Sequence, residues 1–199
     1  GEIVWEWLWH EHFDELGFDE AAKNALYRNP NYEPTSIEGI DAASWLHINS
    51  VSYLGPNKWY DAGDERFHPD NVIWDSRQSN ILGITDRKTG KIVWRVGPDY
   101  DATPALRELG QVVGPHHCHM IPRGLPGAGN ILLFDNGGQA GYGSPNPASD
   151  TGMGNARRDH SRVIEFDPVT LEVVWEYTAG KAGYRNEKFY SINVSSAQR

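Results

Sequence analysis

Histidine side chains are concentrated in two short segments that the sequence pattern predicts to be strands. His47 lies in the first segment, and His116, His117 and His119 lie in the second. Imidazole transfers protons near neutral pH, attacks as a nucleophile and binds metal ions, so this clustering favours a functional site over separate structural roles. Because side chains alternate along a strand, we expect His117 and His119 on one face and His116 on the other.

Two arginines add positive charge near predicted strand ends. Arg77 follows Asp-Ser, and Arg162 follows His-Ser. In a chain of formal net charge -9, either guanidinium could bind an anionic group through two parallel hydrogen bonds. A solvated surface Arg is the simpler alternative for both residues. The same net charge argues against nucleic acid as a partner, because nucleic acids are bound through patches of Lys and Arg.

One motif recurs three times and organises the chain. It reads GEIVWEW from Gly1, GKIVWRV from Gly90 and LEVVWEY from Leu171. The second and third copies follow an Asp-Arg and an Asp-Pro step, which are typical of tight hairpin turns. Each of these copies is therefore predicted to be the closing strand of a hairpin.

Two units of four strands can be traced backwards from these hairpins. Repeated four-stranded units are typical of β-propeller blades, and 21 Gly and 12 Pro favour turns over long helices. We therefore predict an all-β fold in which residues 1–199 form part of a single β-propeller domain, with about two and a half blades present. Its predicted parts are the last strand of one blade at 1–9, a helical and loop insertion at 10–44, a blade at 45–97, a blade at 116–178 and the first strand of the next blade at 189–199.

Three insertions separate the predicted strands. The spacing of apolar residues in 9–29 predicts a short amphipathic helix, whereas 57–70 and 136–159 are rich in Gly, Pro, Asn and Asp and are predicted to be ordered surface loops. A closed propeller needs roughly 16 to 32 strands. We therefore expect the rest of the ring to come from further sequence or from another chain, including a possible homo-oligomer.

Membrane insertion and export leave no trace in the sequence. No apolar run approaches the roughly 20 residues of a transmembrane helix, so we expect no membrane insertion. Residues 1–9 are acidic and aromatic, and they do not have the pattern of a signal peptide.

Several motifs together resemble the arylsulfate sulfotransferase family. They are WLHINS from Trp45, GNILLFDNG from Gly129 and SRVIEF from Ser161, and the likeness extends over residues 1–199. The resemblance implies a six-bladed propeller in the periplasm or outside the cell. It also implies transfer of a sulfuryl group from an aryl sulfate donor to a phenolic acceptor, without a nucleotide or a cofactor.

The resemblance also implies roles for individual residues. His47, His117 and Arg162 match catalytic positions, with His119 as the alternative match for His117. The nucleophilic histidine of the family is expected beyond Arg199. The residues expected to bind substrate are Asn49, Arg77, His116, His119 and Asn136.

Two other functions stay open on the sequence. His47, His117 and His119 on neighbouring strands could supply three nitrogen ligands to a divalent transition metal, although no carboxylate flanks them as an orienting partner. A non-enzymatic propeller that acts as a binding module is the second alternative, because a fold does not decide a function.

Overall fold

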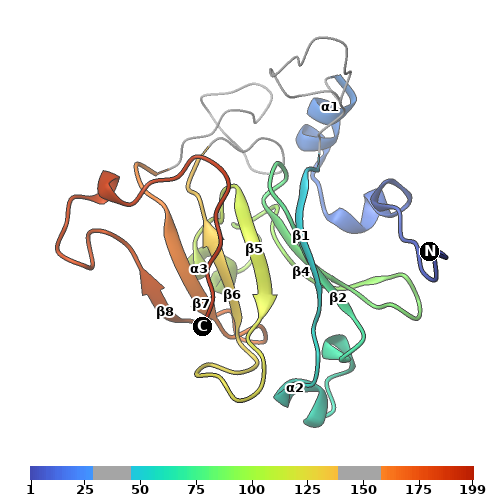
Figure 1. Cartoon of the computed structure of the whole chain (residues 1–199). Coiled ribbons are helices and arrows are strands. Elements are labelled where there is room, and N and C mark those ends of the chain that lie inside the picture. The colour runs from blue at the N-terminus through green and yellow to red at the C-terminus, as the bar shows by residue number, and fades with distance from the viewer. Residues whose placement is uncertain (29–45, 139–157) are drawn as a thin grey trace.

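Two antiparallel sheets dominate the chain. The computed structural model describes residues 1–28, 46–138 and 158–199, and the strand orders are β1-β2-β3-β4 and β5-β6-β7-β8 (Figure 1). The all-β prediction is confirmed, and the two sheets, at 48–96 and 115–177, agree closely with the predicted four-strand units at 45–97 and 116–178. The strands are β1 (Ile48–Tyr53), β2 (Val72–Ser76), β3 (Ile81–Thr85), β4 (Ile92–Val96), β5 (Pro115–Met120), β6 (Ile131–Asp135), β7 (Arg162–Phe166) and β8 (Val173–Tyr177).

Short helices occupy the connections. The amphipathic helix predicted over 9–29 is two helices, because Gly17 adopts a left-handed φ of 76° that ends the first one. The predicted loop at 57–70 contains two helical turns, whereas residues 29–44 of the insertion at 10–44 and residues 139–157 of the loop at 136–159 lie outside the described residues. The helices are η1 (Trp9–Leu16), α1 (Glu20–Arg28), α2 (Lys58–Asp61), η2 (Glu65–Phe67), α3 (Pro104–Leu109) and η3 (Asn186–Lys188). In the described ranges, none is long and apolar enough to cross a membrane.

Aspartate residues shape the two predicted hairpin turns. Asp86 Oδ1 accepts hydrogen bonds from two backbone N–H groups of its turn, each at 2.8 Å. Asp167 Oδ1 does the same at 2.7 and 3.0 Å. The last turn residue has a left-handed φ in both hairpins, which costs little for Gly90 and strains Leu171. The hairpins predicted from the recurring motif are therefore confirmed.

Apolar side chains cover both faces of the first sheet. Ile73, Leu82 and Ile84 are fully buried against the second sheet, and Trp74 faces the other way, against the N-terminal helices. The alternation follows from the strand period of two, since neighbouring side chains point to opposite faces. Burial on both faces holds the first sheet between the second sheet and the N-terminal helices, and it fixes the register of the strands.

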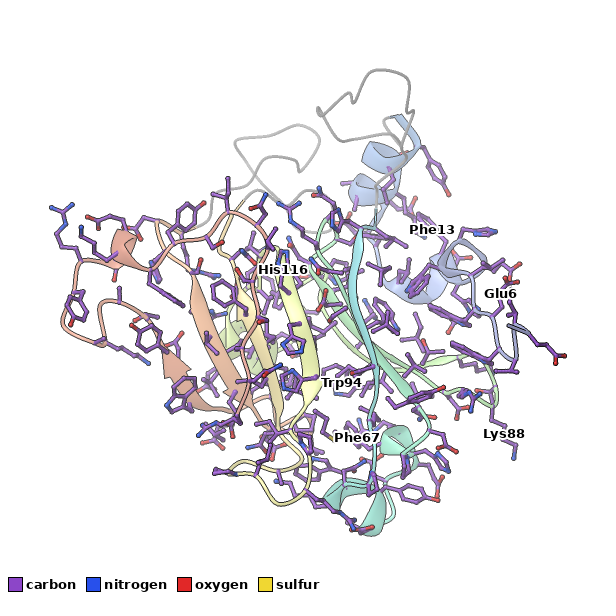
Figure 2. The ribbon with its side chains drawn as sticks, in the orientation of Figure 1. Glu6, Phe13, Phe67, Lys88, Trp94 and His116 are labelled. Atoms are coloured by element: carbon purple, nitrogen blue, oxygen red, sulfur yellow. The ribbon has the colours of Figure 1, made fainter. Side chains whose placement is uncertain are left out.

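A tryptophan of the recurring motif ties successive units together. Trp94 of β4 is 7% exposed and lies between the two sheets (Figure 2), where its indole N–H donates to the carbonyl oxygen of Pro168 at 2.8 Å. In the preceding copy of the motif, the indole N–H of Trp5 donates to Arg87 O at 3.2 Å. Both acceptors follow the turn aspartate, so the same contact is made twice. The third copy, Trp175, is 42% exposed.

Replacing Trp94 by Phe is expected to lower the free energy of unfolding by about 1 kcal/mol through loss of this hydrogen bond. Phe keeps most of the apolar contact, and it leaves the buried Pro168 carbonyl without its donor. Trp5→Phe is the matched control and should cost less, because Trp5 is half-buried and water can replace the lost donor. Urea unfolding measures the loss of stability in each variant. An equal or larger loss for Trp5→Phe would contradict a stabilising role of the hydrogen bond between Trp94 and Pro168.

Residues 1–8 and 189–199 differ from the expectation that both are strands. Neither segment has strand pairing in the structure, because a strand requires a ladder of backbone hydrogen bonds and these segments are held mainly through side chains. The C-terminal segment nevertheless runs alongside β5 (Figure 1), where its Val194 and Ala197 contact histidines of that strand.

Candidate functional site

The two histidine-bearing strands are neighbours in space. β1 and β5 contact each other where the sheets meet (Figure 1). Each strand is bulged, between Ile48 and Ser50 in β1 and between His116 and His119 in β5. His47 and His117 have left-handed φ values of 48° and 54°. A bulge adds a residue to one strand and redirects the side chains beside it. The left-handed backbone at His47 and His117 adds local strain, because residues other than glycine rarely adopt it.

The histidines of the two strands do not occupy corresponding positions. Asp75 and Phe134 correspond, because they pair with Leu82 and Val163, each four residues before its turn aspartate. Ser50 pairs with Asp75, whereas His116 pairs with Phe134. The place of His116 in the second sheet is thus held by a serine in the first.

His117 and His119 form a pair, as their predicted common face requires. Their ring centroids are 4.5 Å apart, and both side chains are half-buried. His117 Nδ1 lies 2.9 Å from Ala197 O, and His119 Nδ1 lies 3.0 Å from His117 O. A carbonyl oxygen only accepts, so each Nδ1 carries the proton and each Nε2 has a lone pair for chemistry. Burial lowers the pKa of His119 and favours its neutral form.

His116 uses both ring nitrogens to hold main chain. Its Nδ1 lies 3.0 Å from Gly114 O, and its Nε2 accepts from Val194 N at 3.1 Å. Burial lowers the pKa of His116, and the nearby charge of Arg77 lowers it further. The predicted substrate-binding role of His116 is therefore replaced in this geometry by anchoring of the C-terminal segment.

Acid is expected to release this segment from β5. The pKa of His116 in the folded chain lies below the ordinary value of 6.5. Its neutral ring therefore contributes fully to the free energy of unfolding above about pH 6.5, and this contribution is lost as the pH falls through the lowered pKa. The protection of the Val194 amide against hydrogen exchange should decline accordingly. The Ser191 amide, which donates to the non-titrating Ser161 Oγ at 2.9 Å, is the control. A pH-independent protection factor at Val194 would remove His116 from this role.

Of three other residues predicted to bind substrate, two lie beside His116 and one lies on the surface. Arg77 is buried beside His116, with Nη2 3.4 Å from Ile192 O. Asn136 lies beside His116 and donates to Ser191 O at 2.7 Å. Asn49 is exposed, like His47. The structure thus brings Arg77, Asn136 and His116 together, around the C-terminal segment.

Arg162 is held away from this cluster by ion pairs. Its Nε donates to Asp135 Oδ2 at 2.7 Å, and Nη1 lies 3.4 Å from Glu176 Oε1. Burial is the largest single influence and opposes the charge, but Asp135 and Glu176 together outweigh it, and the pKa of Arg162 is raised. In the part of the chain that the structure describes, its contacts include no histidine of β1 or β5. The Arg that shares a neighbourhood with the histidines is Arg77, and the prediction of a catalytic Arg162 is not matched by its contacts.

The three-histidine metal site is not assembled. Among the described residues, no group of three or more His, Cys, Asp or Glu side chains is placed to hold a metal ion. His117 and His119 are paired through their rings, whereas His47 lies exposed before the first pair of β1. The geometry therefore does not support the metal-dependent alternative.

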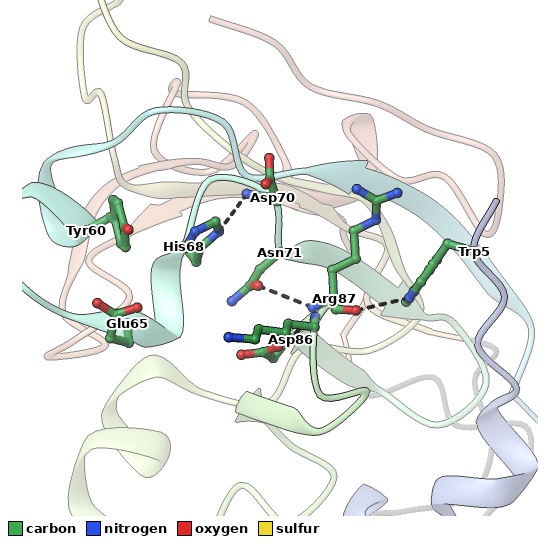
Figure 3. A pocket seen from close by; sticks show the side chains of 9 residues that line it. Trp5, Tyr60, Glu65, His68, Asp70, Asn71, Asp86 and Arg87 are labelled. Carbon is green, nitrogen blue, oxygen red and sulfur yellow. Dashed lines mark hydrogen bonds between the residues drawn. The ribbon is translucent and has the colours of Figure 1, made fainter.

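A pocket of about 500 Å³ lies at the turn end of the first sheet, between Trp5, Tyr60, His68 and the β3–β4 turn (Figure 3). Its walls are tied by Asn71, which accepts from Arg87 N at 3.3 Å. A second pocket of about 360 Å³ lies between Phe134 and the C-terminal segment. Neither pocket is lined by a residue that the sequence predicts for the site.

Comparison with known proteins adds one finding. The model of a family described as Arylsulfotransferase (ASST) matches residues 1–199. No curated protein and no solved structure gave a significant match to the chain.

Proposed function

The chain belongs to the arylsulfotransferase family, and from this we propose that it takes part in sulfuryl transfer from an aryl sulfate to a phenol without a nucleotide donor. The observation that carries the proposal is the pair His117 and His119, whose Nε2 atoms both keep a lone pair beside the strand of His47. Such nitrogens can exchange protons with a phenol and, once protonated, attract a sulfate oxygen.

The proposed reaction has two steps. A nucleophilic histidine outside residues 1–199 forms a bond to sulfur while the bond from sulfur to the aryl oxygen breaks, and the leaving oxygen takes a proton from Nε2 of His117, which begins the cycle protonated at that nitrogen. The acceptor phenol then returns a proton to His117, its oxygen bonds to sulfur, and the nitrogen–sulfur bond breaks. Charge on the sulfate oxygens needs fixed positive partners, and we assign these to His47 and Arg77, with Arg162 kept in its ion pairs.

We also propose that the two sheets are neighbouring blades of one larger propeller, six-bladed as in the family resemblance. Trp94 of the first sheet is covered by the second sheet, whereas the corresponding Trp175 is 42% exposed. A further blade over the second sheet would cover it, from additional sequence or from another chain. A periplasmic or extracellular location accords with this family membership.

The full-length protein tests the proposed activity. With 4-nitrophenyl sulfate as donor and phenol as acceptor, we expect 4-nitrophenol and phenyl sulfate in equal amounts without added nucleotide. A parallel reaction supplies 3′-phosphoadenosine 5′-phosphosulfate as the only donor. Transfer from the nucleotide alone would contradict the proposal, as would release of inorganic sulfate in place of phenyl sulfate.

A further inference from the structure

A buried carboxylate lies where the two histidine-bearing strands meet. Asp75 of β2 is 0% exposed. Its Oδ2 accepts from the hydroxyl of Ser50 on β1 and from the backbone N–H of Cys118 on β5, the latter at 2.8 Å. A single carboxylate oxygen therefore joins β1 and β5, the first strands of the two sheets, and on β5 it binds Cys118, the residue between His117 and His119.

The bulges explain why an acceptor is needed at this place. A bulge leaves backbone N–H groups without ladder partners, and buried N–H groups must find an acceptor. The Ser50 hydroxyl that donates to Asp75 lies at the bulge in β1, so the carboxylate serves this bulge as well as the one in β5. Its contacts fall at the points where both strands depart from regular pairing.

The fold alone does not require a carboxylate here. The corresponding residue of the second sheet is Phe134, which packs on Phe189 with ring centroids 5.5 Å apart. Keeping an acid in the core has a cost, because burial raises the pKa of Asp75 to about 6 despite its hydrogen bonds, and its titratable neighbour, the Cys118 thiol, is buried too. Phe134 shows that an apolar side chain serves this position where no second histidine strand has to be held.

We infer that Asp75 is a positioning residue that fixes the His117–His119 pair relative to the strand of His47. It touches no reacting atom and acts through the backbone of β5 and the hydroxyl of Ser50. Its effect on catalysis rests on the proposed sulfuryl transfer, whereas its effect on the histidine geometry does not.

Steady-state kinetics of full-length variants test the catalytic effect. Asp75→Leu is expected to lower kcat by about 10²-fold, the loss typical of groups misplaced by about 1 Å, with a smaller change in KM. Asp75→Asn keeps one acceptor oxygen and should recover part of kcat. Ile73→Ala is the control, because Ile73 is fully buried two residues earlier on the same strand and makes no hydrogen bond to β5. A kcat for Asp75→Leu no lower than that of Ile73→Ala would overturn the inference.

Ring ¹H–¹⁵N NMR spectra give a readout that is independent of activity. The ring signals of His117 and His119 should shift in Asp75→Leu and stay in place in Ile73→Ala. Should Asp75→Leu fail to fold, Asp75→Asn carries the same comparison with smaller shifts. Unchanged histidine signals would overturn the inference. An inactive wild-type protein with shifted signals would instead overturn the proposed function and leave the positioning role standing.

Discussion

Replacing His47 or His117 by Asn is expected to lower kcat for sulfuryl transfer by about 10² to 10⁴-fold, the contribution typical of a general acid or base or of a close charge partner. Asn suits both positions because its short polar side chain tolerates a left-handed backbone, and both histidines have φ near 50°. The bulges should therefore survive, and the loss should reflect the missing imidazole. Release of 4-nitrophenol in the presence of phenol measures it.

The control for this pair of substitutions is His68→Asn. His68 lines the pocket at the turn end of the first sheet (Figure 3), whose lining contains no residue of β5, so its loss should leave kcat within about twofold. Melting temperatures of all three variants verify folding. An undiminished kcat in His117→Asn would remove that residue from the mechanism, and the same holds for His47.

The repeated sheets could be predicted because their signals are local. An aspartate that caps its own turn, a left-handed residue four positions later and a tryptophan shortly after lie within about ten residues, as from Asp86 to Trp94. The alternation of side chains also placed His117 and His119 on one face, which the ring contact confirms. Such short-range patterns determine strand, turn and face together.

The site could be predicted only in part, because its decisive contacts are distant in sequence. Arg77 and Arg162 both lie near strand ends in the sequence, yet Arg162 forms ion pairs with Asp135 and Glu176. His116 accepts a hydrogen bond from Val194, which lies 78 positions later in the chain. Asp75 gave no signal at all, since an acid in a strand that ends at a turn is expected to face water. The bulges redirect the side chains of the histidine-bearing strands, and no local sequence pattern predicts a bulge.

Replacing Asp135 by Asn is expected to lower the free energy of unfolding by about 3 to 5 kcal/mol, the usual cost of breaking a buried ion pair. Asp135 is 0% exposed and pairs with two arginines, Arg158 through Oδ1 and Arg162 through Oδ2. It also accepts from Val113 N at 3.0 Å. The amide keeps the shape of the side chain but leaves two guanidinium groups without their main counter-charge. Urea unfolding measures the loss.

The matched control for Asp135→Asn is Glu187→Gln, which removes the carboxylate of an exposed pair with Arg185 and should cost less than about 1 kcal/mol. The comparison also decides what Arg162 does. A large loss of unfolding free energy in Asp135→Asn would mean that Arg162 has a structural role. Its contacts with Asp135 and Glu176 indicate that it links β6, β7 and β8. A loss no greater than that of Glu187→Gln would mean that Asp135 releases Arg162 cheaply, and the guanidinium would then be available to a sulfate group, as the sequence motif predicts.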